Sequence, residues 1–270
     1  MDYTKYNRAN DYEWLYENYV TLKKSTNELA KELGYKSANS IRQSLIRNEI
    51  PIRGRSESHR IKRVDNVIIN HEVIEGTLLG DGYMNGKKHN TSDTCPSIRK
   101  KNKNIDHLKY VCDLLVSNGI VYSGTRYLKK TGKEYPQHLF FSTRSDKLIP
   151  YYNRWYPEYN GYKKVVPEDI NITPNVLLHW FLDDGSTSYC GDKKNPMIIF
   201  CSESFTKDEN QMLCDKINIP FSLGAKISPT NSGTGWRVRI PGNRCNDFFN
   251  ILGMCPVKSL EYKWKLSRLN

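Results

Sequence analysis

Two aspartates, each followed by a glycine, are the side chains of this sequence best placed for chemistry. Asp81 stands in the segment IEGTLLGDG and Asp184 in LLHWFLDDG, 103 residues further along the chain. Each segment is apolar before its acid, so we expect two short helices, one from near Asn70 to Asp81 and one from Asn175 to about Asp184. Both carboxylates then lie at helix C-termini, where the backbone already carries partial negative charge.

Two such carboxylates side by side would repel each other, and a divalent cation would supply the counter-charge. Hard oxygen ligands without a His/Cys cluster favour Mg²⁺ over zinc, and Mn²⁺ is expected to substitute. A backbone carbonyl beside the acid is a further candidate ligand, so the predicted metal-binding residues are Asp81, Asp184, Gly80 and Asp183. The competing interpretation is structural, because Asp-Gly is a common turn.

The two acidic segments begin two divergent copies of one unit, predicted at residues 67–165 and 166–270. Similar features follow each acid in the same order: an amphipathic helix, strand-like segments, an aromatic pair in a further helix, and a lysine about 80 residues after the acid. Helices are expected at 104–118 and 207–218, and strands at 124–130, 137–144, 223–228 and 235–241. Repetition in register indicates an internal duplication with a pseudo-two-fold axis.

The charge of the chain indicates a polyanionic partner. There are 41 Lys and Arg residues against 29 Asp and Glu, a net charge of +12, and residues 61–164 carry 18 basic against 10 acidic side chains. Alternation along 236–240 makes one sheet face basic, so two such sheets would suit double-stranded DNA. A merely solvated basic surface is the alternative. The predicted DNA contacts of the two repeats are Arg99, Lys101, Arg126, Arg144, Lys226, Arg237 and Arg239.

The N-terminal residues 1–54 are predicted to form a small all-α helix-turn-helix domain. Ser25 and Glu28 form a capping box, Gly34 provides a turn, and Ser37 is the expected cap of a third helix. A plain three-helix bundle is the alternative interpretation. Residues 55–66 are predicted to be a basic linker. Side chains suited to reading base edges in the third helix are Asn39, Arg42, Gln43 and Arg47.

Several classes of protein are excluded by the composition. No apolar run approaches the ~18 residues of a membrane helix, and the polar N-terminus has no signal region. The seven cysteines include no C-x-x-C pair and are expected to be reduced thiols. We therefore expect an intracellular, cytoplasmic monomer without a membrane partner, with an organellar or phage origin left open.

With these acidic helices, the chain resembles a single-chain LAGLIDADG homing endonuclease. IEGTLLGDG and LLHWFLDDG occupy the nine motif positions, with departures at Glu75, Leu79 and His179. YKKVVPEDINITPNVLLHWFLDDGS, SESFT and PVKSLEYKW extend the similarity over about residues 70–267. The resemblance implies an α+β fold of two pseudo-symmetric αββαββα repeats, in which saddle-shaped antiparallel sheets cover DNA and the motif helices meet at the pseudo-dyad.

The resemblance also implies roles for individual residues. Asp81 and Asp184 would bind Mg²⁺, and Lys164 and Lys263 would be the paired catalytic lysines, with Lys163 as the alternative to Lys164. The implied function is that of a Mg²⁺-dependent endodeoxyribonuclease that makes a site-specific double-strand break in DNA, as in intron homing. The alternatives are an intron maturase, which is an RNA-splicing cofactor of the same fold, and a non-catalytic DNA-binding regulator.

Overall fold

A computed structural model describes residues 8–54, 67–86, 95–116, 121–128, 132–189, 196–230 and 232–265. The chain divides into two compact units, Met1–Val64 and Asp65–Asn270. The predicted basic linker, residues 55–66, lies outside the described residues. In the described part of the chain, no helix combines the length and the apolar character that crossing a membrane requires.

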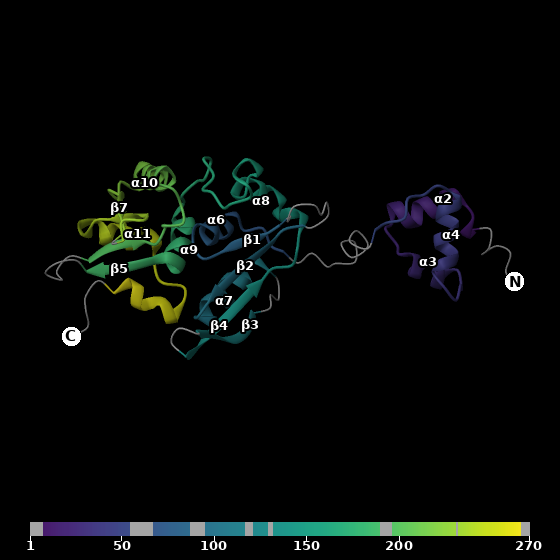
Figure 1. Ribbon diagram of the computed structural model, residues 1–270, viewed down its shortest axis with the longest axis horizontal. Coiled ribbons are helices and arrows are strands. Elements are labelled where there is room, and N and C mark those ends of the chain that lie inside the picture. The colour runs from purple at the N-terminus through teal and green to yellow at the C-terminus, as the bar shows by residue number, and fades with distance from the viewer. Residues whose placement is uncertain are drawn as a thin grey trace. The chain divides into compact units, whose positions relative to one another are not determined.

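The first unit is a small helical unit with its own core. It consists of α2 (Tyr12–Leu15), which continues into a π-helical segment (Tyr16–Thr21), then α3 (Thr26–Glu32) and α4 (Asn39–Arg47) (Figure 1). Leu15, Leu29, Ile41 and Leu45 are fully buried in one cluster. The predicted assignment of these helices as a helix-turn-helix motif stays a prediction.

The helix caps and the turn that the sequence predicted for this unit are confirmed in part. The capping box of Ser25 and Glu28 begins α3, and Gly34 follows α3 with a φ of +75°. The N-cap of α4 is Ala38 rather than Ser37, although the Ser37 hydroxyl accepts a hydrogen bond from the Asn39 backbone N–H at 3.1 Å. The serine therefore stabilises the start of α4 from one position further out.

The second unit contains the same order of elements twice, as the sequence predicted. The first half consists of α6 (His71–Leu79), β1 (Tyr83–Asn85), β2 (Ser97–Asn102), α7 (Ile105–Leu115), β3 (Val121–Leu128), β4 (Lys133–Phe141) and α8 (Ile149–Trp155). The second half consists of α9 (Pro174–Asp184), β5 (Gly185–Tyr189), β6 (Pro196–Phe200), α10 (Lys207–Phe221), β7 (Lys226–Pro229), β8 (Trp236–Ile240) and α11 (Cys245–Leu252). A 3₁₀ segment at Lys258–Trp264 follows.

Each half builds one antiparallel sheet of four strands, in the orders β1-β2-β4-β3 and β5-β6-β8-β7. The inward faces are largely apolar, since Ile98, Phe140, Ile198 and Val238 are fully buried. Side chains alternate along a strand, so the neighbours of these residues point outward. The mixed helical and antiparallel fold expected from the sequence is therefore confirmed.

The motif helices α6 and α9 pack against each other where the two halves meet (Figure 1). Asn70 caps α6 and Thr173 caps α9, each accepting a hydrogen bond from a backbone N–H of the first turn. A Cβ atom added to Gly76 would lie 2.6 Å from the Cβ of His179 and 2.6 Å from the carbonyl oxygen of Val176. The glycine therefore permits the close approach of the helices, even though the residue opposite is a histidine.

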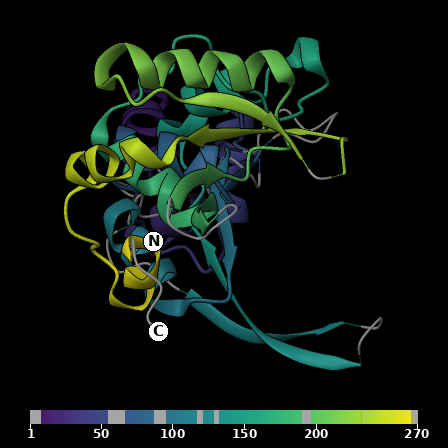
Figure 2. The ribbon, with the colours of Figure 1, turned by 90° about the vertical axis from the view of Figure 1, so that its left-hand side faces the viewer.

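The two sheets differ in the length of their second hairpin. β3 and β4 pair over eight residues, from Val121 opposite Phe140 to Leu128 opposite Lys133. β7 and β8 pair over four residues. In Figure 2 the β3–β4 hairpin extends away from the rest of the second unit, and its tyrosines Tyr122, Tyr127 and Tyr135 are exposed.

Candidate active site

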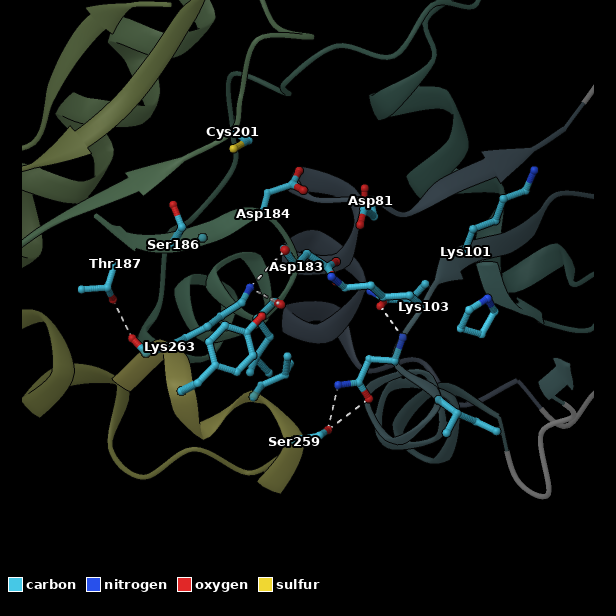
Figure 3. Close-up of a pocket in the computed structure, with 18 of the residues that line it drawn as sticks. Asp81, Lys101, Lys103, Asp183, Asp184, Ser186, Thr187, Cys201, Ser259 and Lys263 are labelled. Atoms are coloured by element: carbon cyan, nitrogen blue, oxygen red, sulfur yellow. Dashed lines mark hydrogen bonds between the residues drawn. The ribbon is translucent and has the colours of Figure 1, made fainter. Parts of the chain in front are cut away.

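The C-terminal ends of α6 and α9 bring Asp81 and Asp184 to one groove (Figure 3). Asp81 lies two residues beyond α6, whereas Asp184 is the last residue of α9 and is half-buried. Lys101 and Arg126 of the first half, and Ser186 and Lys263 of the second, line the same groove. The two acids predicted from the sequence are therefore brought together.

The surroundings of these two acids are suited to a cation. Burial and the neighbouring carboxylates of Asp81 and Asp183 raise the pKa of Asp184 to about 7, and burial and the Asp183 carboxylate also raise the pKa of Asp81. Neither Asp81 nor Asp184 has a hydrogen bond or an ion pair through its carboxylate within the described residues. A divalent cation would offset the repulsion between these carboxylates.

The protein side chains alone would not complete the coordination of such a cation. Across the residues that the structure describes, no three His, Cys, Asp or Glu side chains are grouped as metal ligands. Most of the ligands would therefore be water or phosphate oxygens, which is the usual situation of Mg²⁺ at phosphate-processing sites.

Each helix end also carries a lysine that binds its backbone carbonyls. Lys164 Nζ donates to the carbonyl oxygens of Gly80 at 3.1 Å and Gly82 at 2.8 Å. Lys263 Nζ donates to those of Phe181 at 3.0 Å, Leu182 at 2.8 Å and Asp183 at 3.2 Å. Both ammonium groups thus lie at the negative end of a helix dipole, beside the acids.

These contacts distinguish between Lys163 and Lys164, the two candidates for the catalytic lysine of the first repeat. Lys163 is exposed, whereas Lys164 lies beside the acidic end of α6. Burial lowers the pKa of Lys164 to about 8 and also lowers the pKa of Lys263. The geometry therefore favours Lys164 as the partner of Lys263, although its catalytic role stays a prediction.

The contacts of Gly80 and Asp183 differ from those expected of metal ligands. The Asp183 carboxylate is fully buried and accepts a hydrogen bond from Lys100, so it is turned away from a cation at Asp81 and Asp184. The carbonyl groups of Gly80 and Asp183 accept hydrogen bonds from Lys164 and Lys263. The carboxylates of Asp81 and Asp184 are not engaged in this way by any described residue, and all four predicted metal ligands stay predictions.

The predicted DNA contacts of the first half lie mainly on the outward face of its sheet. Arg99 and Lys101 alternate with the buried Ile98 and Lys100 along β2 and therefore share the outward face. Arg126, on β3, is exposed. Arg144 lies beyond the end of β4 and is therefore not part of the strand, although the sequence predicted a strand over 137–144. Its guanidinium donates to the carbonyl oxygen of Cys95 at 3.4 Å.

In the second half, Arg239 of β8 pairs across the sheet with Lys226 of β7, which places both side chains on one face. Arg237 shares this face but forms an ion pair with Glu203, so its charge is partly compensated.

In the first unit, the four side chains predicted to read base edges are exposed on α4. They are Asn39, Arg42, Gln43 and Arg47.

One charged residue of the site was not singled out from the sequence. Lys100 stands in the run Arg99-Lys100-Lys101, which suggests a uniformly solvated basic strand. Its burial follows only from the alternation of side chains along the strand, which places Lys100 on the same inward face as Ile98, two residues before it. That alternation is the signal by which it could have been found.

Comparison with known proteins agrees with this geometry. Residues 71–248 match the model of the LAGLIDADG DNA endonuclease family. The chain is 26% identical over 200 residues to the probable intron-encoded endonuclease 1 of Wickerhamomyces canadensis, covering 72% of this chain and 83% of that protein. It is 25% identical over 221 residues to an uncharacterized protein of Methanocaldococcus jannaschii, covering 79% of this chain and 80% of that protein.

Among solved structures, the homing endonuclease I-WcaI bound to its DNA recognition sequence has the same fold, with a TM-score of 0.62 and 21% identity over 81% of this chain and 96% of that chain. The family model, for its part, spans well over half of the sequence. This chain therefore belongs to the LAGLIDADG DNA endonuclease family.

Proposed function

We propose that this protein is a site-specific homing endonuclease that cuts both strands of duplex DNA with two pseudo-symmetric centres. The observation that carries the proposal is the matched pair of groups at each motif end: Asp81 with Lys164, and Asp184 with Lys263. Each lysine binds the carbonyls of the helix that ends in its acid. Two equivalent centres in one groove fit a substrate with two equivalent strands.

Asp81 and Asp184 would hold the divalent cations, with Mg²⁺ as the expected metal and Mn²⁺ as a substitute. Their raised pKa values and the repulsion between the neighbouring carboxylates support this assignment. When bound, such a cation supplies positive charge at the phosphate and lowers the pKa of the attacking water.

The two lysines beside the acids and the basic residues that line the groove act on the DNA. The ammonium groups of Lys164 and Lys263 stabilise the negative charge that develops on the phosphate oxygens. Because burial lowers the pKa of Lys164 to about 8, its Nζ can also give a proton to the departing oxygen near neutral pH. Lys101 and Arg126 bind the neighbouring phosphates of the backbone. Since one chain contains both centres, we expect a monomer.

The test begins with selection of a target from a random duplex library by binding in Ca²⁺, followed by cleavage in Mg²⁺. We expect the wild-type protein to make a double-strand break at one sequence. Asp81→Asn and Asp184→Asn should each lower the cleavage rate by about 10²-fold or more, because charge stabilisation of several kcal/mol is lost. Both variants should still bind the target in Ca²⁺.

Three outcomes would contradict the proposal. Full Mg²⁺-dependent cleavage by both aspartate variants would exclude these acids as the metal site. Binding of a defined DNA sequence by the wild-type protein without nicking in Mg²⁺ would instead indicate a DNA-binding regulator. Stimulation of splicing of an intron RNA, again without DNA cleavage, would indicate a maturase.

A further inference from the structure

We propose that a buried ion pair between Lys100 and Asp183 positions the second of the two active centres. The inference rests on the proposed function, since it concerns the centre formed by Asp184 and Lys263. Lys100 belongs to β2 of the first half and Asp183 to α9 of the second. Both side chains are fully buried, and Lys100 Nζ donates to Asp183 Oδ1, so the pair joins the two halves beneath the groove.

The two histidines near this pair do not carry a compensating charge. His107 Nε2 lies 3.4 Å from the same oxygen of Asp183, but burial and the nearby Lys100 lower the pKa of His107 to about 2. Burial also lowers the pKa of His179 to about 4. Both rings are neutral at physiological pH, so within the described residues Lys100 is the charged group that contacts the Asp183 carboxylate directly.

The pair is connected to the reacting groups through one residue. The carboxylate of Asp183 is held by Lys100, and its carbonyl oxygen accepts a hydrogen bond from Lys263 Nζ at 3.2 Å. Asp184 follows immediately in the chain. Fixing residue 183 from two sides therefore sets the direction of the Asp184 carboxylate and the position of the Lys263 ammonium group.

Within the described residues, the first half shows no equivalent of this pair. Gly80 takes the place of Asp183 in the first motif, and a Cβ atom added to Gly80 would lie 2.4 Å from the Cβ of Asp183. On β6, the inward position that matches Lys100 is occupied by Phe200, which is fully buried. The covalent link to Asp184 and the hydrogen bond from Lys263 connect the pair to the second centre, so its loss should affect the two DNA strands unequally.

The experiment measures the cleavage rate of each strand separately, with an end-labelled duplex of the selected target under single-turnover conditions. Removing only Lys100 would leave a buried carboxylate without its partner and could unfold the protein. The main variant is therefore the double substitution Lys100→Met with Asp183→Asn, which removes both charges and nearly preserves the side-chain volumes. Binding of the target in Ca²⁺ shows that the variant is folded.

We expect the double variant to slow one strand by about tenfold or more and the other by less than about threefold. The slowed strand should be the one that Lys263→Met also slows. The matched control is Glu75→Gln, which disrupts another ion pair on a motif helix, between the buried Glu75 and the half-buried Arg154. That control should leave the ratio of the two strand rates unchanged.

A second measurement does not depend on cleavage. Amide hydrogen exchange of residues 181–185 should become at least several-fold faster in the double variant than in the wild type, because the end of α9 is no longer held. Equal slowing of both strands, or unchanged exchange in this segment, would show that the pair serves stability alone. If the wild-type protein cuts no DNA, the proposed function fails, and the exchange rates still decide whether the pair positions the end of α9.

Discussion

At the scale of single residues, each of the two proposed centres has its own lysine, and this lysine binds carbonyl oxygens at the end of a motif helix. The interaction places a positive charge where the helix dipole and an aspartate are both negative. The sequence offered two adjacent candidates in the first half, and the structure places only Lys164 at the carbonyls of Gly80 and Gly82. The two neighbours therefore provide a matched pair for mutagenesis.

We predict that Lys164→Met lowers the cleavage rate by about 10²-fold, because one charge that stabilises the transition state is lost. Lys163→Met removes the same charge from an exposed position and should change the rate by less than about twofold. Single-turnover cleavage of the selected target measures both rates. A larger effect at Lys163 would reverse the assignment.

A second prediction at this scale concerns pH. The pKa of Asp184 is raised to about 7 in the folded protein, so the metal-free fold gains stability from this group at low pH and loses that gain as the pH rises through 7. Cation binding requires the ionised form and should strengthen over the same range. The apparent affinity for Mg²⁺ should be roughly thirtyfold lower at pH 5.5 than at pH 8.

Thermal unfolding with and without Mg²⁺ at the two pH values measures this difference. Asp184→Asn should abolish most of the pH dependence, because no ionisable group remains at this position. Equal stabilisation by Mg²⁺ at pH 5.5 and pH 8 in the wild type would contradict the raised pKa as the cause.

The sequence predicted the residues at the groove better than those beneath it. Asp81 and Asp184 follow from a motif that appears twice in register, so each copy supports the other. The ion pair of Lys100 with Asp183 could not be predicted in the same way, because the pairing depends on which strand of one half lies against the helix of the other. That information is tertiary, and no local pattern in the run of basic residues contains it.

At the scale of elements, the contact between α6 and α9 depends on one small residue. Gly76→Ala would place a methyl group 2.6 Å from a side-chain carbon and from a backbone oxygen of α9. Because backbone cannot give way as a flexible side chain does, we predict a loss of about 1–3 kcal/mol in the free energy of unfolding. Urea denaturation measures it, and Gly54→Ala, at a position with open space around it, is the control.

Helices were more predictable than strands. The capping box of Thr206 and Glu209 marks the start of α10, and apolar spacing predicted α7, α9 and α10 to within a few residues. The strands β1, β2, β5 and β6 were not located, because β1 has three residues and β5 is the largely polar GSTSY. Such strands are stabilised by their neighbours in the sheet rather than by local sequence.

At the scale of the whole molecule, the chain combines a helical unit with the duplicated catalytic unit. If α4 reads base edges, Arg42→Ala with Gln43→Ala should weaken binding of the selected target by at least about tenfold. The cleavage rate at saturating DNA should not change, because these side chains belong to the first unit. Lys31→Ala, which removes one exposed charge from α3, is the control in the same gel-shift titration, and an equal loss in this control would indicate a non-specific charge effect.

Because the β3–β4 hairpin is longer than the β7–β8 hairpin, the protein would bind its duplex in one defined orientation. Four additional paired residues in β3 and β4 add about 13 Å of strand, which corresponds to about four base pairs of duplex. The flank of the target beneath the first repeat would then be read further from the cut than the opposite flank. A protein with hairpins of unequal length would not require a palindromic target. It would tolerate base substitutions more readily in the flank beneath the shorter hairpin than in the flank beneath the longer one.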